Sequence, residues 1–252
     1  MNDIGAELAD ICEAAARLIL PLWRSGLAVT HKADASPVTE ADQRGEALIL
    51  QELAARFPDV PVISEEDASE FGTPDEIGPR FFLVDPLDGT KAFVRGDPNF
   101  TVNIALVEEG VPVAGAVTAP PTGETWCTVG GQTMKRVNGG AAAPARVRAW
   151  PSQDAVCLIS HTMQPQEAEA LALQYGFHRT LAMDSSIKLC RIAEGAADIY
   201  PRHGPTMEWD IAAGHAVLRG AGGRLAAPDG DAFLYGKAQA GFRNGWFVAR
   251  GG

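Results

Sequence analysis

Two aspartates directly follow an apolar run in this chain, and their type and spacing suit metal chemistry. Residues 81–90 read FFLVDPLDGT, so Asp85 and Asp88 come at the end of a continuous stretch of β-forming residues. Such a run predicts a strand buried on both faces. Pro86 has no N–H to donate, which predicts that the strand ends there. The Gly-Thr pair that follows predicts a helix start, whose free N–H groups and dipole favour a phosphate. Acids beside an anion-binding turn favour divalent cations with oxygen ligands between them.

Purely local roles compete with this interpretation. Asp85 is also placed to form an Asx turn, and a D-x-x-D motif alone favours that role because short matches are often accidental. Asp42 is similarly ambiguous. With Thr39 it resembles a capping box that opens a helix ending before Pro58, but it also suits an acid that faces the cations from a helix start. The sequence leaves both roles of Asp42 open.

Three adjacent acids, Glu65, Glu66 and Asp67, follow a short apolar strand expected at residues 60–64. Because like charges repel, a solvated loop is the first interpretation of these acids. If this strand lies beside the strand that ends at Asp85, Glu65 and Asp85 can share cations. The choice therefore depends on strand order, which the sequence does not give.

Composition narrows the classes of protein. The chain has 252 residues, is 46% hydrophobic and carries a net charge of −11. It is long enough for one large domain or two small ones. The negative charge argues against a nucleic acid polymer as partner. An anionic small-molecule substrate then requires metals or a local basic cluster that reverses the sign of the charge at the site.

The cysteines and the N-terminus predict a cytoplasmic protein. None of the four cysteines has C-x-x-C spacing, which indicates reduced, structural thiols. The N-terminus begins with acidic residues, unlike a signal peptide. The longest early apolar run, residues 18–23, is too short to cross a bilayer, so we expect no transmembrane segment.

Helices and strands alternate along the chain, which is the signature of a mixed α/β fold. We expect helices at residues 4–22, 39–57, 164–175, 185–194 and 209–219, and strands at 60–64, 81–84, 100–107, 111–117, 125–129, 155–160 and 198–200. Glu109-Gly110 predicts the turn of a hairpin. The Gly/Ala/Pro-rich segment 138–144 predicts a boundary between two subdomains, 1–143 and 144–252. Asp210, near the start of the last helix, is by itself best explained as an acidic cap.

Three motifs together resemble the signature set of the inositol monophosphatase superfamily of magnesium-dependent, lithium-sensitive phosphatases. They are Glu65-Glu66, the DPLDGT of residues 85–90 and the WDIAAG of residues 209–214, in that order. Three motifs in order are more specific than any one alone. The resemblance covers almost the whole chain. It implies a layered αβαβα sandwich like that of the inositol monophosphatases and fructose bisphosphatases, with the site at the interface of the two subdomains.

Within the superfamily, the chain is more similar to the CysQ branch of 3′(2′),5′-bisphosphate nucleotidases. The matching segments are residues 32–42, 85–91, 100–106, 185–190 and 200–206. One departure is Ala92, where this branch usually has an acid. The branch implies removal of the 3′-phosphate of adenosine 3′,5′-bisphosphate (PAP), with its sulfated analogue PAPS as a further candidate substrate. An inositol-1-phosphatase or broad sugar phosphatase is the alternative. A non-catalytic phospholigand-binding protein gains no support, because every matched ligand position keeps its carboxylate.

The resemblance also implies roles for individual residues. The metal ligands are Glu65, Asp85, Asp88, Asp210 and the carbonyl of Leu87. They would hold two or three Mg²⁺ ions, and Li⁺ is expected to inhibit the enzyme. The catalytic residues are Asp42, Thr90 and Glu65, with Thr90 and Asp42 orienting the attacking water. Gly89 and Thr90 hold the phosphate through their N–H groups. The resemblance leaves monomer and homodimer open.

A substrate with two phosphates needs a second anion site. Ser185 and Lys188 are three apart on an expected helix and therefore share a face. Arg202 follows the next short strand and offers a planar fork to phosphate oxygens. His161 matches a position that packs near the nucleotide in the relatives. Each of these residues alone is explained by surface charge or a strand-end polar group, but together with the Ser-Ser-x-Lys and Pro-Arg-x-Gly-Pro matches they favour a substrate site.

Overall fold

The computed structural model describes residues 3–26, 28–31, 37–150 and 154–252. Within these residues the strands form sheets of seven, five and two strands. The large sheet has the order β3 (Val62–Ser64), β4 (Arg80–Asp88), β5 (Thr101–Glu108), β6 (Val111–Ala119), β7 (Glu124–Val129), β8 (Gln132–Val137), β9 (Ala143–Pro144). The five-stranded sheet has the order β11 (Arg179–Ala182), β10 (Val156–Ile159), β12 (Ile199–Arg202), β14 (Phe247–Arg250), β13 (Arg224–Ala226). The strands β1 (Val29–His31) and β2 (Pro37–Thr39) pair with each other.

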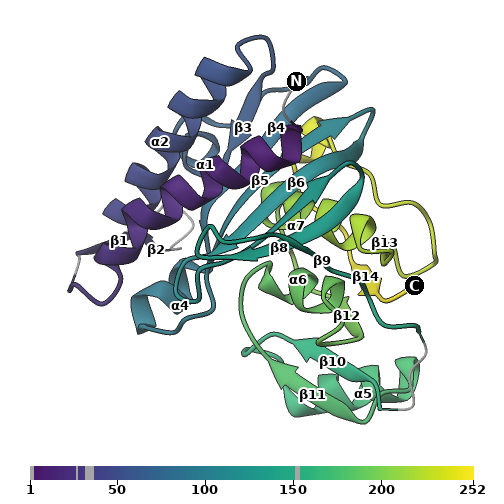
Figure 1. Cartoon of the computed structure of the whole chain (residues 1–252). Coiled ribbons are helices and arrows are strands. Elements are labelled where there is room, and N and C mark those ends of the chain that lie inside the picture. Colours follow the sequence, from purple (N-terminus) through teal and green to yellow (C-terminus); the bar gives the residue numbers. More distant parts are fainter. Residues whose placement is uncertain (1–2, 27, 32–36, 151–153) are drawn as a thin grey trace.

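The helices separate these sheets into layers (Figure 1). They are α1 (Ile4–Ile19), α2 (Glu40–Arg56), α3 (Glu65–Phe71), α4 (Thr90–Arg95), α5 (Pro165–Tyr175), α6 (Ile187–Ala193) and α7 (Glu208–Gly220), with the 3-10 turns η1 (Leu20–Leu22) and η2 (Ala238–Ala240). The helices α1 and α2 pack on one face of the large sheet. The helices α6 and α7 lie between the two sheets, and α5 covers the outer face of the smaller one. The implied αβαβα sandwich is confirmed.

Alternation along β4 explains the layering. Phe82 and Val84 join the core under α1 and α2, whereas Phe81 and Leu83 join the core shared with α6 and α7. Successive side chains of a strand point to opposite faces, so this apolar run fills two cores at once. The predicted strand buried on both faces is confirmed.

The prediction that Pro86 ends this strand is wrong. The strand β4 continues to Asp88, and its pairing with β5 shifts between Asp85, opposite Asn103, and Asp88, opposite Thr101. Three positions along β4 thus match two along β5, which is a β-bulge. A bulge leaves a residue out of the ladder, so a proline without an N–H is tolerated there. The bulge also lets both aspartates face the same region.

The acids 65–67 form the first turn of α3, so the solvated loop expected for them is wrong. Negative side chains are favourable in the first turn because they oppose the positive end of the helix dipole. The strand β3 pairs in parallel with β4, with Ser64 opposite Val84. Glu65 and Asp85 therefore leave adjacent strands at the same edge, as sharing a cation requires.

The hairpin turn is confirmed, with positive φ at Glu109 and Gly110 between β5 and β6. The first helix is shorter than expected, because α1 ends at Ile19 and the chain continues as η1, which contains Pro21. Segment 138–144 includes β9 at the edge of the large sheet, while α7 from the second half packs on β4, β5 and β6. The division at residue 143 stays a prediction.

All four cysteines lie among the described residues, and each is a buried free thiol, as expected. Among the helices that the structure describes, none combines the length and apolar character needed to cross a membrane.

Candidate active site

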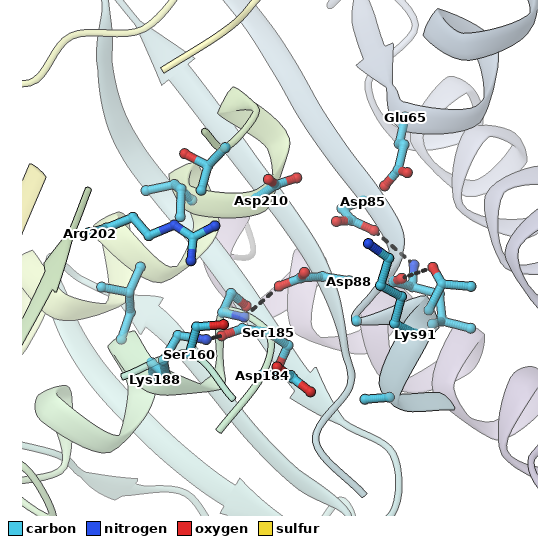
Figure 2. A pocket seen from close by; sticks show the side chains of 18 of the residues that line it. Glu65, Asp85, Asp88, Lys91, Ser160, Asp184, Ser185, Lys188, Arg202 and Asp210 are labelled. Carbon is cyan, nitrogen blue, oxygen red and sulfur yellow. Dashed lines mark hydrogen bonds between the residues drawn. The ribbon is translucent and has the colours of Figure 1, made fainter. Parts of the chain in front are cut away.

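The predicted metal ligands line a pocket of about 300 Å³ where the ends of β4, β10 and β12 meet the start of α7 (Figure 2). Its acidic side consists of Glu65, Asp85, Asp88 and Asp210, with Leu87, Gly89, Thr90 and Lys91 beside them. Its other side includes Ser160, Asp184, Ser185, Ser186, Lys188, Tyr200 and Arg202. Residues from both halves of the chain therefore face one cavity.

Three acids form a cluster suited to cations. One carboxylate oxygen from each of Glu65, Asp85 and Asp210 lies within 4.8 Å of the other two. Burial, reinforced by the neighbouring acids, raises the pKa of Asp85 and of Asp210 well above the usual range. Burial also raises the pKa of Asp88 to about 6, although Lys188 opposes the shift. Mutually repelling carboxylates at the wall of a pocket, with hard oxygen donors, fit Mg²⁺.

The local roles weighed for these acids also exist. The Asp85 Oδ1 atom accepts the Leu87 N–H at 3.0 Å, which forms the Asx turn. Asp210 Oδ2 accepts the N–H of Met207, the residue at the N-cap position of α7, at 2.8 Å. Each carboxylate is thus oriented by one backbone bond, while an oxygen of each remains in the cluster. The cap and the site are compatible functions of one side chain.

Asp42 likewise has both of the roles left open. Its Oδ2 atom accepts the Thr39 N–H at 2.8 Å and the Thr39 hydroxyl at 2.7 Å, completing the capping box of α2. Its Oδ1 atom accepts the Thr90 hydroxyl at 3.1 Å. Thr90 Oγ1 also lies 3.1 Å from the Leu87 carbonyl oxygen. Burial raises the pKa of Asp42 despite these hydrogen bonds, as suits a group that accepts a proton.

Gly89 joins Asp88 to α4 in a conformation that other residues rarely adopt. Its φ is +96°, and a Cβ atom added there would lie 2.9 Å from the Asn99 carbonyl oxygen. Only glycine avoids both the strained φ and the clash. The turn therefore brings the backbone of residues 89 and 90 to the wall of the pocket.

The prediction that Ser185 and Lys188 share a helix face is wrong. Ser185 precedes α6 and has φ +58°, and the helix begins at Ile187. The turn is held because the Ser186 N–H donates to Asp88 Oδ2. The Ser186 hydroxyl donates to Asn103 Oδ1 at 2.8 Å. Tertiary hydrogen bonds to β4 and β5 therefore override the helical spacing.

Lys188 is a buried cation, with 4% of its surface exposed, so surface charge does not explain it. Its Nζ atom donates to the carbonyl oxygens of Met183 at 3.1 Å and Ser185 at 2.7 Å. It also lies 5.0 Å from the centre of the Tyr200 ring. Burial lowers its pKa to about 8, although Asp88 opposes the shift.

Arg202 and His161 occupy different positions relative to the pocket. Arg202 extends into it and donates to the Pro205 carbonyl oxygen at 3.1 Å (Figure 2). His161 is outside the pocket lining and pairs with Asp184, Nδ1 to Oδ2, at 3.3 Å. Asp184 also binds Arg95 at 2.6 Å and does line the pocket.

Sequence reasoning missed several residues in and next to the pocket, and one matching segment is described only in part. Ser186, Asn103 and Tyr200 lay inside matched segments, but the sequence assigned them no role of their own. The match at residues 32–36 lies outside the described residues.

Comparisons with known proteins place this fold and site in a family. The sequence pattern of the inositol monophosphatase family matches residues 5–247, so the chain belongs to that family. The 3′(2′),5′-bisphosphate nucleotidase CysQ of Escherichia coli K12 is 40% identical over 197 residues, covering 78% of this chain and 78% of the relative. Histidinol-phosphatase of Mycobacterium tuberculosis is 35% identical over 216 residues, covering 83% and 81%. The crystal structure of CysQ from Bacteroides thetaiotaomicron has a TM-score of 0.79 at 31% identity, covering 98% of this chain and 96% of that one. The resemblance inferred from three motifs is confirmed.

Proposed function

We propose that the chain is a Mg²⁺-dependent phosphatase that hydrolyses the 3′-phosphate of adenosine 3′,5′-bisphosphate, giving AMP and phosphate. The observation that carries the proposal is one pocket lined by the acids Glu65, Asp85, Asp88 and Asp210 and also by the cations Lys188 and Arg202. A substrate with two phosphates can use both sets of residues: the acids bind one phosphate through metal ions, and the cations bind the other phosphate directly. The relatives named CysQ support the nucleotidase assignment.

The acidic side is proposed to bind the reacting phosphate. Glu65, Asp85, Asp88, Asp210 and the Leu87 carbonyl oxygen would hold two or three Mg²⁺ ions. Bound Mg²⁺ supplies charge neutralisation at the phosphoryl oxygens and lowers the pKa of water. The N–H groups of Gly89 and Thr90 would hold the phosphate, since both residues line the pocket. Buried oxygens fixed by backbone bonds need little reorganisation during the reaction.

Thr90 and Asp42 are proposed to orient the attacking water and to accept its proton, and Glu65 is the third proposed catalytic residue. The Thr90 hydroxyl donates to Asp42 Oδ1, so its lone pairs are free to accept a hydrogen bond from the water. As the water oxygen attacks phosphorus, its proton passes through Thr90 Oγ1 to Asp42 Oδ1. The bond from phosphorus to the ribose oxygen breaks, and the ribose oxygen takes a proton from solvent.

The second phosphate is proposed to bind at the basic side. Arg202 offers a planar fork to phosphate oxygens, and Lys188 adds a positive charge beside Ser185. His161 would pack near the nucleotide from outside the pocket lining, where it pairs with Asp184.

Four buried free thiols fit a reducing compartment such as the cytoplasm. Monomer and homodimer both satisfy this proposal, because the pocket is lined by one chain.

A side-by-side assay of phosphate release tests the proposed function. The substrates are adenosine 3′,5′-bisphosphate, inositol-1-phosphate and histidinol phosphate, each with Mg²⁺ and with excess chelator. We expect the highest kcat/KM for the bisphosphate and no turnover in chelator. A preference for either monophosphate would replace the nucleotidase assignment by a different phosphatase of the family, and full activity in chelator would overturn the metal mechanism.

A further inference from the structure

Glu46 is a buried acid near the site to which neither the sequence motifs nor the proposed reaction assigns a role. It lies on α2, one helical turn after Asp42, and only 6% of its surface is exposed. Its Oε1 atom accepts the N–H groups of Glu66 at 3.0 Å and Asp67 at 3.4 Å. These are the second and third residues of α3, whose first residue is Glu65.

This contact replaces the ordinary cap of α3. Ser64 is at the N-cap position, where a serine hydroxyl commonly accepts an N–H of the first turn, but it makes no such bond here. Glu46, from another helix, accepts two of those N–H groups instead. The start of α3 is therefore fixed to α2, and Glu65 is fixed with it.

The helix α2 contacts three segments that carry site residues. Asp42 binds Thr90 at the start of α4. Gly45 lies against the bulge of β4, since a Cβ atom added to it would be 3.4 Å from the Cβ atom of Pro86. Glu46 binds the start of α3. One face of α2 thus holds these segments in a common frame.

A buried carboxylate at this position is electrostatically unfavourable. Burial and the nearby Asp67 raise the pKa of Glu46, and hydrogen bonds only partly offset them. An apolar residue would avoid this penalty. The structure keeps an acceptor there, and the N–H groups at the start of α3 use it.

We propose that Glu46 is a positioning residue, which holds the metal ligand Glu65 in place by capping α3 from α2. The inference rests on the proposed function in one respect, that Glu65 binds a cation. The Glu46 carboxylate acts as a hydrogen-bond acceptor and not as a ligand or a proton carrier. What α3 needs from residue 46 is an oxygen at the right distance, whatever its charge.

Calorimetric titration with Mg²⁺ or Mn²⁺, in the absence of substrate, tests this role. Glu46→Gln keeps the oxygen acceptor and loses the charge, so we expect metal affinity within about twofold of the unmodified chain. Glu46→Leu removes the acceptor and should lower the metal affinity by about 10- to 100-fold, the range typical of groups that orient a ligand. Glu46→Asp keeps the charge but has a shorter side chain, so it should lower the metal affinity as Glu46→Leu does. Glu52→Leu, on the same helix but half-exposed and paired with Arg56, is the matched control with unchanged affinity.

The outcomes separate the inference from the proposed function. Unchanged affinity in both Glu46→Leu and Glu46→Asp overturns the positioning role. Equal weakening in Glu46→Gln and Glu46→Leu overturns it too, because the charge would then be the active feature. If Glu46→Leu fails to fold, Glu46→Asp compared with Glu46→Gln decides alone. An unmodified chain that binds no metal overturns the proposed function, whereas an affinity that is unchanged in Glu46→Leu and Glu46→Asp overturns only the role of Glu46.

Discussion

Lys188 and Asp88 bind opposite ends of a single peptide group. The Lys188 ammonium donates to the carbonyl oxygen of Ser185 at 2.7 Å, and the N–H of the next residue, Ser186, donates to Asp88 Oδ2. The peptide dipole therefore lies between a buried cation and a partly buried carboxylate. Charge-assisted hydrogen bonds of this kind are stronger than neutral ones. They account for the left-handed Ser185, because the turn orients the peptide toward Asp88.

Replacing Lys188 by Met should lower the turnover of every substrate. The variant removes the ammonium while filling its space, so the peptide that orients Asp88 loses one anchor. Losing one charge-assisted hydrogen bond, about 1.5–3 kcal/mol, corresponds to a fall in kcat of about tenfold or more. Steady-state kinetics on adenosine 3′,5′-bisphosphate and inositol-1-phosphate measure it. An unchanged kcat, with a higher KM for the bisphosphate alone, would show that Lys188 only binds the second phosphate.

The bond between Thr90 and Asp42 predicts a chemical defect without a metal defect. Thr90→Val and Asp42→Asn each remove the acceptor path for the water proton. General acid–base groups contribute about 10²–10⁴-fold, so we expect kcat to fall by at least about 100-fold. Metal affinity, titrated without substrate, should stay close to that of the unmodified chain because neither side chain is a proposed ligand. A near-normal kcat in both variants would exclude the proton path.

The sequence predicted the site better than it predicted the elements that hold it. Asp85, Asp88 and Asp210 were identified from motif order, and each does face the pocket. The capping of α3 by Glu46 was not predictable, because it depends on two helices meeting through tertiary packing. Edge strand β11 was also missed. Its four residues are exposed and lack the apolar alternation that marks a half-buried strand.

Lithium should inhibit the reaction. Li⁺ is a small, hard cation that the carboxylate cluster of Glu65, Asp85 and Asp210 can accept in place of a second Mg²⁺. Initial rates with adenosine 3′,5′-bisphosphate, measured in LiCl and in NaCl at equal ionic strength, should be lower in LiCl. Equal rates would show that this site excludes Li⁺, without changing the assignment as a phosphatase.

His215 should make stability depend on pH. It lies on α7 with 8% of its surface exposed, and its Nδ1 atom is 3.0 Å from the Tyr235 hydroxyl. Burial, with Arg219 adding to it, lowers the pKa of His215 to about 4. The unfolded chain binds this proton near pH 6.5. The stabilisation is therefore complete above about pH 6.5 and is lost as the pH falls toward about 4, by at most about 3 kcal/mol.

Urea unfolding at several pH values between about 4 and 6.5 measures this loss. The control is His215→Gln, which cannot titrate and should show a shallower dependence of unfolding free energy on pH. Parallel curves for the two proteins would contradict the assignment of the pH dependence to His215. The comparison cancels the contribution of the acidic cluster, which both proteins keep.

Arg202 should decide between substrates with one and two phosphates. Its guanidinium extends into the pocket from the end of β12, and Asp210 lies beside it (Figure 2). Arg202→Ala should raise KM for adenosine 3′,5′-bisphosphate by about tenfold or more, since a charge-assisted hydrogen bond is worth about 1.5–3 kcal/mol. The same change should hardly affect adenosine 3′-monophosphate or inositol-1-phosphate, which have no second phosphate to place there. The matched control is Arg224→Ala, because Arg224 also donates to a loop carbonyl, that of Gly230 at 3.1 Å, but lies outside the pocket lining. Equal losses on all three substrates in Arg202→Ala would make Arg202 a structural residue, and the nucleotidase assignment would be reduced to a general phosphatase.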